Sequence, residues 1–275
     1  MGEGAGRSGG FNDLGPRLAS AFVMAALALA AFWAGGVYSA VLVGVTAALM
    51  LFECRAITLG VAEARRAMLY LIAMAGAAVS AQMGGAAAGL IVLIAFAIAG
   101  ALADRFRAAW AWSFLFALYF GLAAVMVVAL RGDGPHGYLS VLWIVLVVVA
   151  TDTGAYVSGR MIGGAKLWPS VSPKKTWAGL LGGAGLAGLT SAVFSGLALG
   201  YLELALIPLA IFVACVAQGG DLAESAFKRK FGVKDSSRMI PGHGGVFDRL
   251  DGMVAAVIAA GLITLARGGA PIYLW

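Results

Sequence analysis

The sequence predicts an all-α, polytopic integral membrane protein with about nine transmembrane helices and two long cytoplasmic loops. Of its 275 residues, 62% are hydrophobic and 12% are charged, and the mean hydropathy is +0.95. Soluble domains are about half apolar and about one quarter charged, so this composition excludes a water-soluble globule. The apolar runs are continuous rather than alternating, which favours helices over the strands of a membrane barrel.

Apolar runs between charged residues define the expected helices. A membrane span needs about 20 apolar residues, and the candidate runs lie at 18–33, 37–53, 67–83, 86–103, 108–130, 138–157, 176–199, 201–219 and 252–266. The 40 glycines suit this class, because small residues let membrane helices approach closely. Thr176 stands where it can cap the start of the seventh helix.

The chain divides into three expected regions. Residues 1–17 form a cytoplasmic tail rather than a signal peptide, because the run that follows lacks a clear cleavage pattern. Residues 18–137 have short connectors and few charges, which indicates amino-terminal membrane scaffold helices. Residues 138–275 contain the two long loops, 158–175 and 220–251, and we expect a carboxyl-terminal catalytic membrane domain there.

The distribution of positive charge predicts the orientation. With the N-terminus inside, 17 of the 19 Lys and Arg residues fall in cytoplasmic segments, and only Arg131 and Arg267 fall outside. Cytoplasmic loops of membrane proteins carry such an excess. This asymmetry accounts for the net charge of +6 without a nucleic-acid partner.

Acidic residues follow the eighth expected helix directly. Asp221, Glu224, Ser225 and Lys228 have the spacing i, i+3, i+4 and i+7. They share one face if that helix continues past the membrane surface. Asp152 is a third acidic position, near the inner end of the sixth expected helix.

A second acidic pair, Asp248 and Asp251, stands at the start of the last helix. Carboxylates at membrane depth usually face a cavity, a partner or a cation. Magnesium takes carboxylate oxygens together with substrate phosphates. We therefore predict a metal site formed by Asp221, Asp248 and Asp251. The alternative is ion pairing at the lipid headgroups, for example between Asp221 and Lys228.

Basic residues close to these acids indicate a site for phosphate oxygens. Glycines beside His243 would let backbone N–H groups approach an anion. Lys174 and Lys175 follow a proline-bounded turn, although such a pair is also typical of a simple topology signal. The predicted anion-binding residues are Lys174, Lys175, Lys228, Arg229, Lys234, His243 and Arg249.

A long motif then carries a resemblance to a known family. Ser225-Ala-Phe-Lys-Arg is followed, after four residues, by Lys234-Asp-Ser-Ser-Arg-Met-Ile-Pro-Gly-His-Gly-Gly-Val-Phe-Asp-Arg-Leu-Asp251. This stretch resembles the signature of phosphatidate cytidylyltransferase, the CDP-diacylglycerol synthase family. Asp152-Thr-Gly-Ala-Tyr156 and residues 169–179 are similar to it too, whereas Gly164 departs where a basic residue is expected.

The resemblance implies an enzyme of phospholipid biosynthesis in the bacterial cytoplasmic (inner) membrane, with its active site on the cytoplasmic side. It would join CTP to phosphatidate among membrane phospholipids, with Mg²⁺ and a second, monovalent cation such as K⁺ as cofactors. A homodimer is compatible with it. By this analogy the catalytic residues are Asp221, Asp248, Asp251, Lys228 and His243. Substrate would contact Lys174, Lys175, Ser225, Arg229, Lys234, Arg249 and Asp152.

Three other functions are weighed against this one. Asp251-Gly-Met-Val-Ala255 is similar to the start of the CDP-alcohol phosphotransferase motif, but Ala256 replaces its arginine and no acid follows Asp251. A CTP-dependent lipid kinase would share the nucleotide and the membrane. A transporter would be expected to carry polar residues at its midplane, whereas this chain concentrates them in loops.

Overall fold

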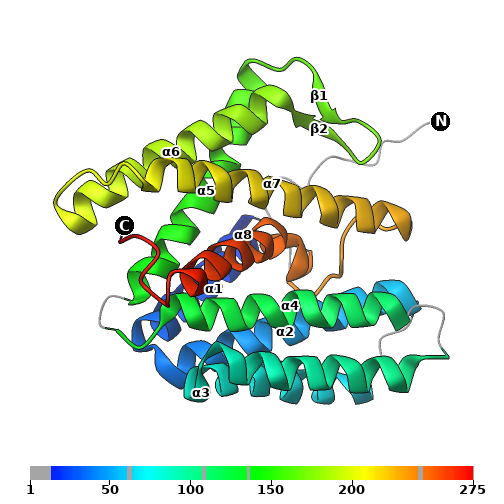
Figure 1. Ribbon diagram of the computed structural model, residues 1–275. Coiled ribbons are helices and arrows are strands. Elements are labelled where there is room, and N and C mark those ends of the chain that lie inside the picture. Colours follow the sequence, from blue (N-terminus) through cyan, green and yellow to red (C-terminus); the bar gives the residue numbers. More distant parts are fainter. Residues whose placement is uncertain (1–13, 61–63, 107–109, 135–136, 241–243, 275) are drawn as a thin grey trace, which may run out of the picture.

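The computed structural model describes residues 14–60, 64–106, 110–134, 137–240 and 244–274. A bundle of helices makes up most of it (Figure 1). In chain order the elements are α1 (Leu14–Ala34), α2 (Gly36–Leu59), α3 (Ala64–Asp104), α4 (Trp110–Arg131), α5 (Gly137–Met161), β1 (Lys166–Trp168), β2 (Ser172–Thr176), α6 (Trp177–Leu199), α7 (Leu206–Lys230) and α8 (Phe247–Ala266).

Length and composition confirm the membrane class. Among the described residues, seven helices are long and apolar enough to cross a membrane, and α1 contains a shorter apolar stretch, Phe22–Ala34. The protein is therefore a multi-pass membrane protein. The number of nine spans and the division into scaffold and catalytic regions remain predictions.

The α3 element folds back on itself at Gly85. The φ of Gly85 is 78°, a left-handed conformation that interrupts the helix. The two halves then pack together, since the rings of Tyr70 and Phe96 lie 6.4 Å apart and Arg66 pairs with Asp104. The expected helices 67–83 and 86–103 correspond to these two halves.

The segment 158–175 differs from the expected loop. It contains a small antiparallel hairpin, in which Lys166 faces Thr176 and Trp168 faces Ser172 across β1 and β2. The hairpin projects from one end of the bundle, beside the carboxyl-terminal half of α7 (Figure 1). Thr176 then caps α6 as expected, because its hydroxyl accepts a hydrogen bond from the Gly179 amide at 3.0 Å.

The two helices that border the 220–251 segment both extend into it further than expected. The α7 helix begins at Leu206 rather than at 201 and continues to Lys230, so residues 220–230 are helical rather than loop. The last helix begins at Phe247 rather than at 252. Helical structure therefore carries both acidic pairs.

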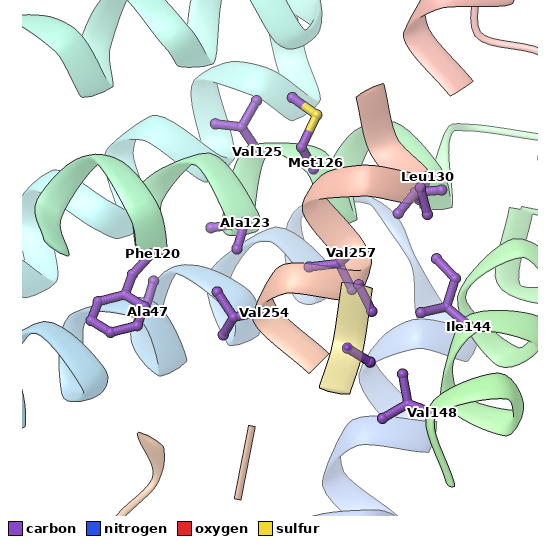
Figure 2. Packing of buried hydrophobic residues seen from close by; sticks show 14 of the residues in the cluster. Ala47, Phe120, Ala123, Val125, Met126, Leu130, Ile144, Val148, Val254 and Val257 are labelled. Atoms are coloured by element: carbon purple, nitrogen blue, oxygen red, sulfur yellow. The ribbon is translucent and has the colours of Figure 1, made fainter. Parts of the chain in front are cut away.

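The α8 helix lies at the centre of the bundle and packs against α4, α5 and α7. Figure 2 shows Val254 and Val257 of α8 among buried side chains from neighbouring helices, including Phe120 and Ile144. Burial of such side chains fixes the depth and rotation of α8. The acidic first turns of α8 are thereby held in one position.

Close contact between α7 and α8 depends on two glycines. A Cβ atom at Gly220 would lie 2.7 Å from Ala255 and 2.9 Å from the Asp251 carbonyl oxygen, and one at Gly252 would lie 3.0 Å from the Ala217 carbonyl. Glycine lets the backbones approach to this distance. The approach brings Asp221, next to Gly220, close to Asp251.

Candidate functional site

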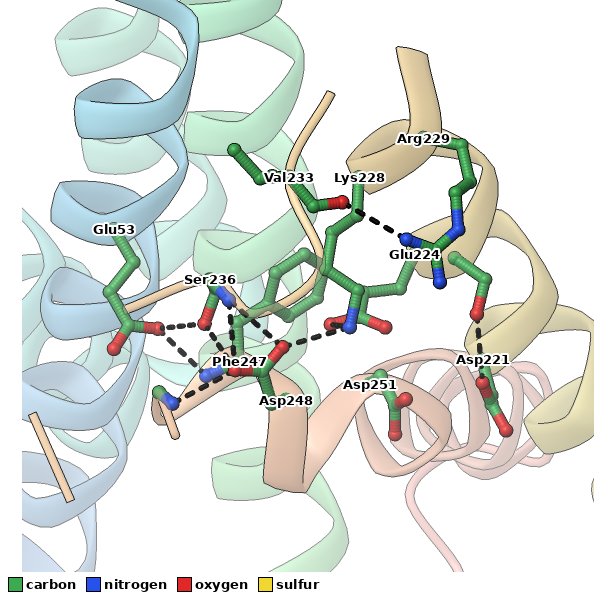
Figure 3. Close-up of polar contacts among 12 residues, drawn as sticks. Glu53, Asp221, Glu224, Lys228, Arg229, Val233, Ser236, Phe247, Asp248 and Asp251 are labelled. Carbon is green, nitrogen blue, oxygen red and sulfur yellow. Dashed lines mark hydrogen bonds and ion pairs between the residues drawn. The ribbon is translucent and has the colours of Figure 1, made fainter. Parts of the chain in front are cut away.

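Three carboxylates converge where α7 and α8 touch. One oxygen each from Asp221, Glu224 and Asp251 lie within 4.8 Å of one another. Asp221 and Glu224 come from α7 at the spacing i, i+3, and Asp251 comes from the second turn of α8 (Figure 3). We call these three residues the acidic cluster. The continuation of α7 to Lys230 meets the condition under which Asp221 and Glu224 share a face, and the expected proximity of Asp221 and Asp251 is confirmed.

Partners from other elements border the acidic cluster. The Lys175 ammonium of β2 lies 2.5 Å from Asp221 Oδ2 and also donates to the Gln218 carbonyl at 3.4 Å. The Ser225 hydroxyl donates a long hydrogen bond of 3.5 Å to Asp221 Oδ1. Asp152 of α5 is exposed, and its charge interacts with those of Asp221 and Lys175. The hairpin and α5 thus contribute charge to the same site.

Lys228 joins the acidic cluster to Asp248. Its ammonium lies 2.8 Å from Glu224 Oε1 and 2.9 Å from Asp248 Oδ1. Asp248 also accepts hydrogen bonds from the amides of Ser236 and Gly245, each 2.9 Å from Oδ2, and from the Ser236 hydroxyl at 3.0 Å. Its oxygens are therefore turned toward protein donors. Glu224, rather than Asp248, lies with Asp221 and Asp251 in the acidic cluster, and the predicted metal ligation by Asp248 remains a prediction.

Glu53 is an unforeseen member of the site. It belongs to α2 and is 1% exposed. Its carboxylate accepts hydrogen bonds from the amides of Val246 and Phe247, both at 2.9 Å, and from the hydroxyls of Ser236 and Ser237 at 3.0 and 2.6 Å. Figure 3 shows Glu53 beside Ser236 and Phe247. An acid at the start of a helix satisfies its unpaired N–H groups and favours its dipole. Glu53 therefore fixes α8 and the preceding loop.

The surroundings of Gly245 explain why the motif has a glycine at this position. A Cβ atom there would meet the Ser236 hydroxyl and would lie 2.7 Å from the Glu53 carboxylate. The bare backbone lets the Gly245 amide reach Asp248 instead. Gly245 thus serves packing around Asp248 and Glu53, and the anion binding expected of the motif glycines remains a prediction.

The remaining predicted residues are exposed or lie beyond the described residues. Lys174 is exposed on β2, next to Lys175. Arg229 is exposed and donates to the Val233 carbonyl at 3.3 Å, as Figure 3 shows. Lys234 and Arg249 are exposed. His243 lies outside the described residues.

The donor set of the acidic cluster fits a hard cation. All three groups are carboxylates, and hard divalent ions such as magnesium prefer oxygen ligands. Lys175 and Lys228 offset part of the negative charge, at Asp221 and Glu224 respectively. Closely spaced acids on two touching helices, bordered by lysines, are an arrangement suited to holding a cation beside anionic groups.

The fold and the site together define a class: a multi-pass membrane protein with an acidic, lysine-bordered site where two helices meet. The chain belongs to the cytidylyltransferase family, whose sequence model matches residues 16–265. This assignment confirms the family resemblance carried by residues 152–156, 169–179 and 225–251.

Named relatives agree with this assignment. The chain is 43% identical over 176 residues to a phosphatidate cytidylyltransferase of Brucella suis, which is 61% of this chain and 63% of that protein. It is 43% identical over 138 residues to one of Staphylococcus haemolyticus, and 39% identical over 140 residues to one of Bacillus subtilis. These last matches cover 48% and 50% of this chain, and 50% and 51% of the relatives. The matched stretches therefore span less than two thirds of the relatives' lengths.

Proposed function

We propose that this protein is a phosphatidate cytidylyltransferase, which converts CTP and phosphatidate into CDP-diacylglycerol and pyrophosphate. The observation that supports this most is the convergence of Asp221, Glu224 and Asp251 beside Lys175 and Lys228. The relatives, which are named phosphatidate cytidylyltransferases, support the choice of nucleotide and lipid.

The proposed reaction is a nucleotidyl transfer. A phosphate oxygen of phosphatidate attacks the α-phosphorus of CTP, a new P–O bond forms, and the bond from that phosphorus to the bridging oxygen breaks as pyrophosphate leaves. A phosphate monoester is largely ionised at neutral pH, so the site needs no strong general base. Positioning and charge stabilisation can supply the rate.

The acidic cluster would hold the magnesium ion. When bound, such an ion supplies positive charge that reduces repulsion between two polyanionic substrates. We propose Asp221, Glu224 and Asp251 as its ligands, with Asp248 as the residue that orients Lys228. A second, monovalent cation such as K⁺ remains a proposal from the family resemblance.

The basic residues would bind the phosphates. Lys228 stands between Glu224 and Asp248, and Lys175 stands at Asp221, so both ammonium groups are positioned at the edge of the cluster. We propose that they contact substrate phosphate oxygens, which accept charge-assisted hydrogen bonds. Exposed basic residues would extend this surface toward the triphosphate: Lys174, Arg229, Lys234 and Arg249, together with His243.

The membrane setting is part of the proposal. Positive charge in the connecting segments supports a cytoplasmic site in a bacterial inner membrane. There CTP arrives from water and phosphatidate enters sideways from the inner leaflet. A homodimer is proposed on the family resemblance alone, and light scattering of the purified protein would test it.

Position-specific labelling of CTP tests the reaction. Purified protein with phosphatidate and magnesium is expected to move radiolabel from the α-phosphate of CTP into lipid and to release unlabelled pyrophosphate. Label transferred only from the γ-phosphate would identify a lipid kinase instead. No magnesium-dependent transfer and no pyrophosphate release would favour a carrier.

A further inference from the structure

A cavity lies between α2, the two halves of α3, and α4. Its volume is about 410 Å³, which is within the range of small-ligand sites. Most of its wall is apolar and includes Leu51, Leu69, Phe96 and Phe114. It shares no lining residue with the acidic cluster. The cavity is therefore a separate feature of the amino-terminal half.

Charged residues gather at one part of this cavity. The Asp104 carboxylate pairs with Arg55 at 2.7 Å through one oxygen and with Arg66 through the other. The Arg55 guanidinium also lies over the ring of Tyr70, 5.1 Å from its centre. Asp104 is 2% exposed, whereas the Arg66 side chain is 29% exposed. One buried acid thus holds two guanidinium groups beside an apolar space, with the Arg66 side chain reaching the surface.

The charge at this end is positive. Among the described lining residues, two arginines and one aspartate give a net charge of +1. Arginine binds phosphate through paired hydrogen bonds. A ligand for this place should therefore carry an anionic oxygen group.

The cavity also adjoins a surface suited to lipid. Leu69 and Ile72 both line it and are 57% and 63% exposed. They belong to a helix apolar enough to cross a membrane, so their exposed faces would contact acyl chains. A ligand that satisfies both the arginines and these walls has an anionic head and an apolar tail.

We propose that this cavity binds one anionic glycerophospholipid of the membrane, with its phosphate at Arg55 and Arg66 and an acyl chain against α3 and α4. Basic pockets between membrane helices are known to bind anionic headgroups. The proposal does not rest on the proposed catalytic function, because the cavity and the acidic cluster are separate.

The test is lipid titration of the purified, delipidated protein followed by native mass spectrometry. Phosphatidylglycerol is the probe, because it is anionic and is not the proposed substrate, and phosphatidylcholine with the same acyl chains is the neutral comparison. Wild-type protein is expected to bind phosphatidylglycerol at least fivefold more tightly. Equal binding of the two lipids would overturn the proposal.

Two pairs of variants locate the lipid. Arg66→Gln is expected to weaken phosphatidylglycerol binding five- to tenfold, whereas Arg105→Gln, at an exposed arginine that donates to the Leu102 carbonyl, should change it less than twofold. Gly100 lines the cavity and a Cβ there meets nothing within 4 Å, so Gly100→Leu would occupy the space; Gly76 is equally open but does not line the cavity.

Gly100→Leu is therefore expected to weaken binding of phosphatidylglycerol at least fivefold, and Gly76→Leu to leave it within twofold of wild type. Equal loss of phosphatidylglycerol binding in Arg66→Gln and Arg105→Gln, or in Gly100→Leu and Gly76→Leu, would overturn the proposal. Arg55, Asp104 and Arg66 would then form a structural ion-pair network only. If Arg66→Gln does not fold, the glycine pair decides the question by itself.

Discussion

Glu53 and Glu224 are both nearly buried acids, but their surroundings are opposite. Glu53 is 1% exposed and accepts four hydrogen bonds from the loop and the start of α8. Glu224 is 3% exposed, pairs with Lys228, and lies beside Asp221 and Asp251. A buried carboxylate is stable when donors surround it and unfavourable next to like charges. Glu53 thus serves the fold, and Glu224 belongs to the proposed metal site.

The strongest test of this contrast is Asp251→Asn. Turnover of CTP and phosphatidate is expected to fall by about 100-fold or more, because one proposed ligand and its charge are lost. The melting temperature should stay the same or rise, since one of three repelling carboxylates is removed. Pyrophosphate release and thermal unfolding in detergent measure the two effects.

Asp133→Asn is the control for that variant, because Asp133 is exposed and pairs with Gln82 rather than with the cluster. It should retain wild-type turnover. Near-normal turnover in Asp251→Asn would remove the proposed ligand role.

Asp248→Asn should lower both the stability of the protein and its turnover. Its carboxylate pairs with Lys228 and accepts hydrogen bonds from Ser236 and Gly245. An amide retains only one acceptor oxygen, so we expect about 2 kcal/mol lower stability and about 10- to 100-fold lower turnover. Chemical unfolding and initial rates check this. Lost turnover with unchanged stability would instead indicate that Asp248 is a metal ligand.

Glu53→Gln should act mainly on stability. The side-chain amide would direct N–H groups toward the Val246 and Phe247 amides, which now donate to a carboxylate. We expect a loss of about 2 kcal/mol in the free energy of unfolding and less than about tenfold lower turnover per folded molecule. A large loss of turnover at unchanged stability would contradict the structural role of Glu53.

The smallest expected losses of turnover come from substitutions at two adjacent lysines. Lys175→Gln removes the ammonium at Asp221 and is expected to lower turnover about tenfold, a change of about 1.4 kcal/mol in barrier. Lys174→Gln, at the exposed neighbour, should lower it about twofold. Initial rates at several CTP concentrations measure both. Equal losses would mean that the side-chain direction on β2 does not matter for the site.

Local patterns made part of the site predictable. The spacing of Asp221, Glu224, Ser225 and Lys228 follows helical periodicity, and α7 confirms that they share one face. Thr176 caps α6 as its position before an apolar run indicates. The β1–β2 hairpin was missed, because its pairing depends on a turn between two short polar segments rather than on an alternating apolar pattern.

Distant contacts were not predictable from local patterns. The sequence favoured Asp248 over Glu224 for the acidic cluster, and the difference follows from the donors that surround Asp248 in the folded protein. Glu53 contacts residues more than 180 positions away, and nothing near it in the chain marks those partners.

The sequence by itself determined the membrane class, the helical periodicity of the acids and the family motif, because hydropathy and short spacings are properties of neighbouring residues. The tertiary structure alone decided which carboxylates meet and which are satisfied by the protein. That choice depends on how closely α7 and α8 approach at Gly220 and on how α2 presents Glu53 to α8. Packing sets these distances.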